Sequence, residues 1–163
     1  MTTALIQTAD GTFTAHFSDS GLAGLDFPTG ETVSRTATNE LSAQRSSWLR
    51  LTERALKQAL AGKTPDTLPP LDLSSGTEFQ RRVWNALRKI PSGQTKSYAQ
   101  VAQSIDRPAA VRAVGQACGA NPIPVVIPCH RVLAAGGKLG GFSSGLDWKR
   151  KLLTREGTIP EPD

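Results

Sequence analysis

Residues 121–132 read NPIPVVIPCHRV, and this segment carries the clearest structural and chemical information in the chain. Its apolar run predicts a buried, extended strand, and its three prolines stiffen the backbone because each ring fixes φ. We expect Cys129 at the exit of this strand, followed directly by His130. The pair indicates a reactive thiolate, since a thiol at neutral pH needs a base or a positive neighbour to ionise.

Each of these two residues also has a purely structural interpretation. A single buried cysteine is commonly a small hydrophobic core residue, and a single buried histidine is commonly a hydrogen-bonded packing residue. Their adjacency in a basic part of the chain favours chemistry. Neighbouring side chains of a strand point in opposite directions, so we expect His130 to take the proton of Cys129 through a water rather than by direct contact. A carboxylate elsewhere would then orient the imidazole.

The sequence before this segment predicts three helices. Residues 77–80 (TEFQ) and 97–100 (SYAQ) are capping boxes, which predict a helix over 78–89 and a short helix from Tyr98 onward. Pro108 suits the first position of a third helix, which runs from Ala109 to about Ala117 and ends at Gly119. The last two helices form a helix-turn-helix pattern, which taken alone is a weak indication of DNA binding.

The N-terminal part has a different pattern. Residues 5–27 alternate in polarity around Asp10-Gly11, which predicts short antiparallel strands joined by a hairpin. Helical spacing follows from Leu41 to Leu60, and a Pro- and Gly-rich linker follows over 62–76. We therefore predict an α/β (α+β) fold. It has a small N-terminal α/β subdomain with antiparallel strands and a linker (1–73), and a mostly helical C-terminal subdomain that contains the helix-turn-helix (74–163).

Composition excludes several classes of protein. The 163 residues suit one compact domain or two small ones, and 38% hydrophobic with 20% charged residues argues against disorder. No apolar stretch is long enough to cross a membrane, and the N-terminus lacks a signal peptide, so we expect a cytoplasmic protein with no membrane partner. The two cysteines cannot form a disulfide framework, and a zinc site would need both cysteines and both histidines. We expect no metal.

Charge is distributed unevenly between the two parts. Residues 1–73 carry six Lys and Arg against eight Asp and Glu, whereas residues 74–163 carry thirteen against six. This excess is typical of a solvated surface, or of a surface that binds a polyanion such as nucleic acid. Charge alone does not decide between the two.

The motif Pro128-Cys129-His130-Arg131, preceded by Asn121-Pro122, closely resembles that of the O6-alkylguanine-DNA alkyltransferases, also called methylated-DNA–protein-cysteine methyltransferases. The resemblance covers about residues 76–157. Further segments match in family order and spacing: 79–84, Ser97-Tyr98, 112–115, 141–143, Leu152-Leu153 and Glu156-Gly157.

The resemblance implies a DNA repair protein with methylated-DNA–[protein]-cysteine S-methyltransferase activity. Cys129 would be the acceptor that displaces the alkyl group from O6 of guanine. His130 would be its base through a water, and Glu156 would orient His130. Asn121 would brace this region, and the phenol of Tyr98 would hydrogen-bond the guanine edge and assist the leaving base. The thioether is not reversed, so each molecule would act once, without a cofactor.

The resemblance also implies how the protein would bind its partner, duplex DNA containing O6-alkylguanine, as a monomer. The target nucleotide would be flipped out of the stack, with Arg112 filling the gap. Small residues such as Ala113 and Gly115 would let the recognition helix lie close in the minor groove, and Arg107 would add a phosphate contact.

Four further residues would surround the base: Phe142, Ser143, Ser144 and Lys149. Phe142 stands where many relatives have Tyr, so it offers no hydroxyl to the base. The small Ser144 predicts a wide rim that admits adducts as large as an O6-benzyl group. Relatives with an N-terminal zinc site use Cys and His residues that this chain lacks. The preferred adduct and any action on O4-alkylthymine stay open.

Three other functions compete with this interpretation. Alkyltransferase-like proteins bind damaged DNA without catalysis, but they lack the acceptor cysteine that Cys129 supplies. A helix-turn-helix transcription factor would leave the Pro-Cys-His-Arg motif unexplained. A cysteine hydrolase is disfavoured because the sequence has no evident oxyanion motif.

Overall fold

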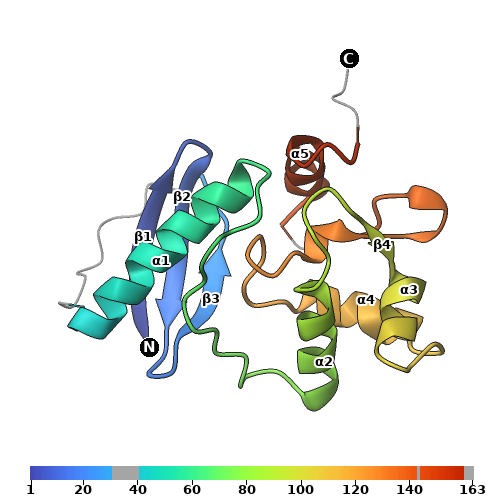
Figure 1. The fold of residues 1–163 in the computed structure, drawn as a ribbon, viewed down its shortest axis with the longest axis horizontal. Coiled ribbons are helices and arrows are strands. Elements are labelled where there is room, and N and C mark those ends of the chain that lie inside the picture. Colours follow the sequence, from blue (N-terminus) through green and yellow to red (C-terminus); the bar gives the residue numbers. More distant parts are fainter. Residues whose placement is uncertain (31–40, 143, 160–163) are drawn as a thin grey trace.

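The computed structural model describes residues 1–30, 41–142 and 144–159 of the chain. A three-stranded sheet and one long helix lie on the left of Figure 1, and the other helices gather on the right. The α+β prediction is confirmed. Across the described residues, no helix has the length and apolar character needed to span a membrane.

The sheet forms as its alternating pattern predicts. Strands β1 (Thr2–Thr8), β2 (Gly11–Phe17) and β3 (Leu22–Asp26) pair antiparallel in the order β1-β2-β3. Phe13, Ala15 and Phe17 alternate along β2 and are fully buried. Gly11 has a φ of 119°, a conformation that glycine adopts without strain, which explains the hairpin at this point.

Helix α1 (Ala43–Leu60) covers the sheet. The side chain of Ser42 caps it by accepting a hydrogen bond from the backbone of Arg45. Trp48 lies on the buried face of α1, and its ring lies 6.5 Å from the ring of Phe17. The predicted linker is not free, because the backbone of Pro70 accepts a hydrogen bond from Leu22 at 2.8 Å and thereby extends the edge of the sheet.

Both capping boxes are present, so the two predicted helix starts are confirmed. Helix α2 (Glu78–Leu87) begins at Thr77, whose backbone and hydroxyl both bond to Gln80. Helix α3 (Tyr98–Ser104) begins at Ser97, which bonds to Gln100 in the same way. Tyr98 is thereby fixed at the first position of a helix.

The prediction for the start of the next helix was wrong. Helix α4 (Val111–Gly119) begins three residues after Pro108, with Ala110 at its N-cap and no side-chain cap. Pro108 instead occupies a turn that is closed by a 2.9 Å hydrogen bond from Ala110 to the carbonyl of Arg107. A proline at the second position of a turn is as favourable as one at a helix start, because both need φ near −65°.

The remaining elements surround the motif. Strands β4 (Lys96–Ser97) and β5 (Val132–Leu133) form a short parallel pair. Two 3₁₀ helices, Cys129–Arg131 and Ala135–Gly137, flank β5, and helix α5 (Leu146–Arg155) follows. One hydrophobic cluster joins the two parts of the molecule, running from the sheet through Trp84 and Ile127 to Leu152.

Candidate active site

The segment before Cys129 is a closed turn and not the strand we predicted. Asn121 holds both ends of this turn: its side-chain NH2 donates to the carbonyl of Ile127 at 2.8 Å, and its side-chain oxygen accepts from the backbone of Ile123 at 2.9 Å. Val125 has a φ of 73°, an uncommon conformation for a β-branched residue, and is buried. The prolines and the hydrogen bonds of Asn121 make residues 121–128 a rigid turn, and Cys129 directly follows it.

Cys129 and His130 lie in a 3₁₀ helix, so the extended geometry that we expected at this pair was also wrong. Both side chains are buried. Nε2 of His130 lies 2.9 Å from Oε1 of Glu156, whereas its Nδ1 is buried without a hydrogen-bond partner among the described residues. Donation from Nε2–H to the carboxylate assigns the free lone pair to Nδ1, so the ring is oriented to accept a proton there.

Arg131 is a part of the site that the sequence interpretation missed. Its guanidinium donates to Glu156 twice: Nε lies 3.1 Å from both carboxylate oxygens, and Nη2 lies 2.8 Å from Oε1. The third nitrogen, Nη1, donates to the carbonyl of Ile90 at 2.7 Å. The place of Arg131 in the Pro-Cys-His-Arg motif could have drawn attention to it. The neighbouring residues do not show that its partner is Glu156, which lies 25 positions further along the chain. Glu156 is therefore held by two buried partners.

These contacts set the protonation states. Burial raises the pKa of Glu156, but the hydrogen bonds and charges of His130 and Arg131 outweigh burial and hold that pKa at about 2. Burial, helped by the charges of Arg131 and Lys149, lowers the pKa of His130 despite the opposing hydrogen bond and charge of Glu156, so the ring is neutral at neutral pH. The arrangement supplies a neutral, oriented base beside an ionised carboxylate.

The thiol itself is not ionised by its surroundings. Burial raises the pKa of Cys129, and a hydrogen bond from Asn121 and the charge of Lys149 oppose that rise only in part. Lys149 is fully buried and donates to the carbonyl of Val132 at 2.7 Å and to that of Gly141 at 3.3 Å. We expected Lys149 to line the base site. It is not among the described residues that line the Cys129 cavity, and its hydrogen bonds join β5 to the loop that contains Gly141.

Cys129 opens onto a cavity of about 570 Å³, within the range of small-molecule pockets. Tyr98 and Phe142 line it together with Cys118, a second cysteine that the sequence interpretation did not assign. Burial raises the pKa of Cys118 to about 12, so this thiol is also protonated at neutral pH. Burial also raises the pKa of Tyr98, which keeps the phenol protonated as a hydrogen-bond donor.

The comparisons agree with this geometry. Residues 78–158 match the family model described as the 6-O-methylguanine DNA methyltransferase DNA-binding domain. A methylated-DNA–protein-cysteine methyltransferase of Methanosarcina barkeri is 39% identical over 155 residues, which cover 93% of this chain and 94% of that protein. The chain belongs to this family.

Two further relatives define the extent of the match. The Mycolicibacterium paratuberculosis methylated-DNA–protein-cysteine methyltransferase is 54% identical over 96 residues, which are 59% of this chain but only 58% of that protein. The solved structure of Mycobacterium tuberculosis OGT in complex with DNA has a TM-score of 0.70 and 36% identity, over 96% of this chain and 93% of that chain.

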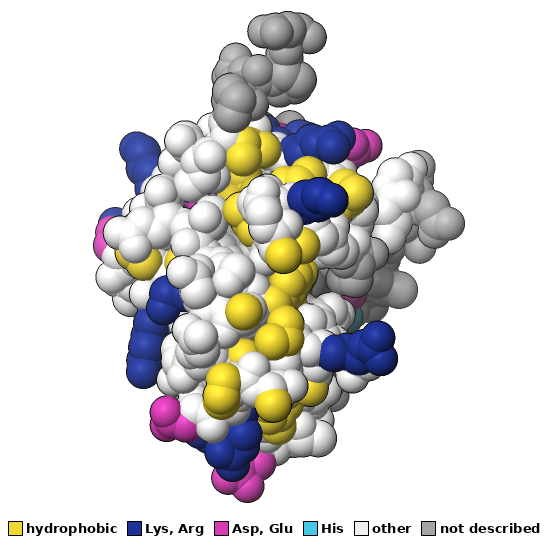
Figure 2. Space-filling view, turned by 90° about the vertical axis from the view of Figure 1, so that its right-hand side faces the viewer, with side chains coloured by type: hydrophobic (Ala, Val, Ile, Leu, Met, Phe, Trp, Pro, Cys, Tyr) yellow, Lys and Arg dark blue, Asp and Glu magenta, His cyan; other side chains and the backbone are white. Residues whose placement is uncertain are grey.

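The helix expected to bind DNA in this methyltransferase family borders the cavity. Arg112 and Gly115 of α4 line it, and Arg112 is exposed, while Ala113 is half-buried beside them. Arg107 is exposed in the turn before α4, where it donates to the carbonyl of Asp106. Figure 2 shows hydrophobic side chains running down this face with Lys and Arg on either side.

Of the two serines expected at the rim, Ser143 lies outside the described residues. Ser144 is exposed and lines a different hollow of about 560 Å³, together with Phe27 and Trp148, and it is not among the described residues that line the Cys129 cavity. A tight turn explains the difference, since Gly145 donates to the carbonyl of Phe142 at 3.0 Å. Gly141 and Phe142, just before the two serines, line the Cys129 cavity.

Metal ligands are not gathered anywhere in the described part of the chain, where no three His, Cys, Asp or Glu side chains come together. His16 pairs with Asp26 on the sheet, with Nε2 and Oδ2 2.6 Å apart. His130 pairs with Glu156, so each described histidine has a carboxylate partner.

Proposed function

We propose that this protein repairs O6-alkylguanine in duplex DNA by transferring the alkyl group to its own Cys129. The observation that carries the proposal is a single assembly: Cys129 on a cavity with Tyr98, and an oriented His130–Glu156 pair directly behind it. The activity in the names of the relatives supports it. The names of these relatives also support the enzyme class, methylated-DNA–[protein]-cysteine S-methyltransferase.

The first step is proton removal. Because burial raises the pKa of Cys129, the thiol stays protonated until a base acts. His130 accepts this proton at Nδ1 through a water, and Glu156 stabilises the imidazolium that forms. The role of Asn121 is to hold the turn that presents Cys129 and to donate to its sulfur.

The second step is direct displacement. The thiolate forms an S–C bond to the alkyl carbon, and the bond between that carbon and O6 of guanine breaks. The guanine anion is a poor leaving group, so Tyr98 donates a proton to it, and the proton that His130 took from the thiol returns through water to the phenolate of Tyr98. The products are unmodified guanine and an alkylated Cys129. No second nucleophile removes the thioether, so the stoichiometry is one alkyl group per protein.

DNA binding supplies access to the alkyl group. The O6 position is buried in the base stack, so the nucleotide must be flipped into the cavity between Tyr98 and Phe142. Arg112 borders the cavity on an exposed position of α4, where it suits the gap in the duplex. Gly115 and Ala113 keep the helix surface close to the minor groove, and Arg107 serves as a phosphate contact.

Two broader assignments belong to this proposal. Residues 1–73 form a supporting subdomain, and residues 74–163 form the DNA-binding and alkyl-acceptor subdomain. The protein acts in the cytoplasm as a monomer, because an acceptor thiol needs a reducing compartment and one molecule contains the whole site.

Intact mass measurement tests the proposal. Incubation with an O6-methylguanine duplex is expected to add one methyl group to the peptide containing Cys129. The addition is expected to be absent in Cys129→Ser and present in Cys118→Ser. Binding to the damaged duplex without any mass change would favour a non-catalytic alkyltransferase-like protein. Modification of Cys118 would reject Cys129 as the acceptor.

A further inference from the structure

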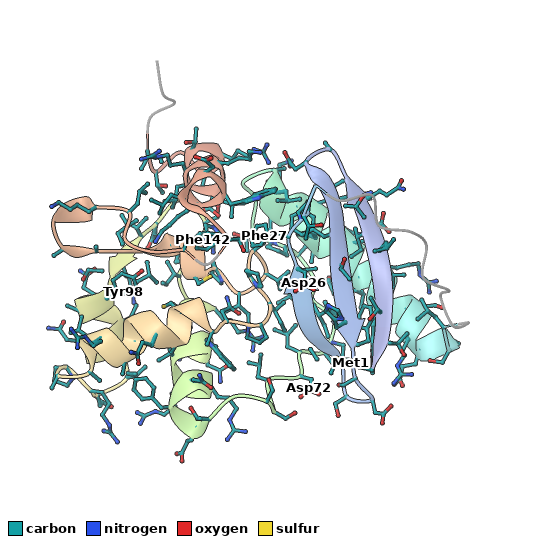
Figure 3. All side chains as sticks on the ribbon, turned by 180° about the vertical axis from the view of Figure 1, so that it is seen from behind. Met1, Asp26, Phe27, Asp72, Tyr98 and Phe142 are labelled. Carbon is teal, nitrogen blue, oxygen red and sulfur yellow. The ribbon has the colours of Figure 1, made fainter. Side chains whose placement is uncertain are left out.

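A chain of aromatic rings connects the N-terminal sheet to the wall of the Cys129 cavity. Phe27 follows β3, and its ring meets Phe142 edge to face, with centroids 5.9 Å apart and planes at 79°. Figure 3 shows the two residues side by side where the sheet meets the C-terminal part. Phe142 lines the cavity with Cys129, whereas Phe27 lines the hollow behind it, so this ring pair separates the two spaces.

Phe27 is itself anchored from two elements. Its ring lies 5.4 Å from that of Phe13 on β2 and 4.8 Å from that of Trp148 on α5. Phe13 is fully buried and also meets Trp148, with centroids 5.7 Å apart at 72°. The ring of Phe27 is therefore a fixed support, because interlocked rings in a close-packed core have few alternative positions.

The segment of Phe142 is held by hydrogen bonds to its backbone, from Lys149 to the carbonyl of Gly141 and from Gly145 to the carbonyl of Phe142, but neither bond fixes the ring of Phe142. Gly140 and Gly141 precede it and Gly145 follows it, and φ is 70° at Gly140 and 101° at Gly145. Glycines leave the backbone many accessible conformations. The phenylalanine ring has no hydroxyl, so no side-chain hydrogen bond fixes it. Among the described residues, the ring of Phe142 has one aromatic neighbour, Phe27, which supports it from the side of the N-terminal sheet.

We propose that Phe27 is a positioning residue for recognition of the alkylated base, acting through Phe142. The N-terminal sheet thereby determines the affinity of a cavity to which it contributes no lining residue. This inference rests on the proposed function. It assigns a role in substrate recognition to a residue outside the segment that matches the family model.

The test compares two phenylalanines of the same sheet region. Phe27→Leu removes the ring that supports Phe142, and Phe17→Leu removes a fully buried ring that meets Trp48 instead. Leucine retains most of the apolar volume, and circular dichroism checks that both variants are folded. Binding is measured in a Cys129→Ser background with an O6-methylguanine duplex and with the same duplex unmodified. Single-turnover transfer is measured with Cys129 present.

We expect Phe27→Leu to lose about fivefold to tenfold in affinity for the alkylated duplex, and nothing for the unmodified one. We expect the transfer rate of Phe27→Leu at saturating duplex to equal that of the wild type. Phe27→Tyr is expected to bind the alkylated duplex with the affinity of the parent protein, and so is Phe17→Leu. Because Phe27 acts through Phe142, the double variant Phe27→Leu/Phe142→Leu is expected to bind as weakly as Phe142→Leu alone.

Several results would overturn the inference: unchanged affinity in Phe27→Leu, equal loss for both duplexes, additive losses in the double variant, or the same loss in Phe17→Leu. If Phe27→Leu is unfolded, Phe27→Met is measured instead and the same expectations apply. If the wild-type chain neither prefers the alkylated duplex nor transfers its methyl group, the proposed function fails and the inference fails with it. Failure of the Phe27 variants alone leaves the proposed function standing.

Discussion

The two parts of this molecule contribute to the site in different ways. Residues 74–163 carry the excess of basic charge and every residue that we assign to chemistry or DNA binding. Residues 1–73 are net acidic and form a sheet and a helix, and none of their described residues (1–30 and 41–73) lines the Cys129 cavity. Yet the two share one hydrophobic core. The comparison teaches that a site can be built from one part of a chain and supported by another.

Two contacts make that support concrete. Asp10, in the hairpin of the sheet, pairs with both Nη atoms of Arg155 at 2.7 Å, and Arg155 directly precedes Glu156. Phe27 packs on Phe142 at the opposite side of the site. The N-terminal part thus contacts the segment that carries Glu156 and the loop that carries Phe142, the residues to which we assign orientation of His130 and recognition of the base.

The largest expected difference between the parts concerns their histidines. His130→Gln is expected to slow single-turnover methyl transfer by about 10²–10⁴-fold, because it removes the base, while duplex binding is retained. His16→Gln, which breaks the similar His16–Asp26 pair on the sheet, is the matched control and is expected to transfer at the wild-type rate. Equal loss in both variants would show that a carboxylate–histidine pair matters only for folding here.

The next largest effect concerns buried and exposed carboxylates. Glu156→Gln leaves the buried Arg131 without its charge partner, so we expect a loss of about 3 kcal/mol in the free energy of unfolding at neutral pH. Glu53→Gln on α1 breaks an exposed pair with Lys57 and is expected to cost less than about 0.5 kcal/mol. Urea titrations measure both.

The pH dependence of the Glu156→Gln effect follows from the lowered pKa. Glu156 has a pKa of about 2 in the folded protein against an ordinary value of 4.5. Its ionised form therefore stabilises the fold fully above that ordinary value, and the contribution is lost as the pH falls towards about 2. We expect the difference between wild type and Glu156→Gln to shrink over this window; a constant difference would contradict the assigned pKa.

A smaller effect is expected at the contact between the two parts. Asp10→Asn weakens the pair with Arg155 and is expected to lower the free energy of unfolding by about 1 kcal/mol. The pair lowers the pKa of Asp10 below 3.8, so this contribution is present above that value and disappears as the pH falls through the lowered pKa. Asp66→Asn, which breaks an exposed pair with Arg54, is the control and is expected to leave the urea midpoint unchanged.

The smallest effect is expected at Ser144. It lines the hollow beside Phe27 and not the Cys129 cavity, so Ser144→Trp is expected to leave the ratio of rates on O6-methylguanine and O6-benzylguanine unchanged. A selective loss of the benzyl substrate would place residue 144 at the rim after all. Gly141→Ala, at a position that does line the cavity, is the comparison variant.

Most of the fold was predictable because its signals are local. The hairpin at Asp10-Gly11 and the capping boxes at Thr77 and Ser97 each depend on residues a few positions apart. The start of α4 was predicted wrongly at Pro108, because the same φ value serves a turn and a helix start. The strand expected before Cys129 was wrong for a related reason, since apolar character indicates burial but does not distinguish a strand from a buried turn.

The sequence by itself determined the helices with capping boxes, the hairpin, the adjacent Cys129 and His130, and the family to which they point, because each of these depends on neighbouring residues. Only the tertiary structure decided that Arg131 shares Glu156 with His130, that Lys149 joins β5 to the loop that contains Gly141, and that Phe27 supports Phe142. These contacts join residues far apart in the chain. Their geometry depends on how the whole core packs, which no local pattern encodes.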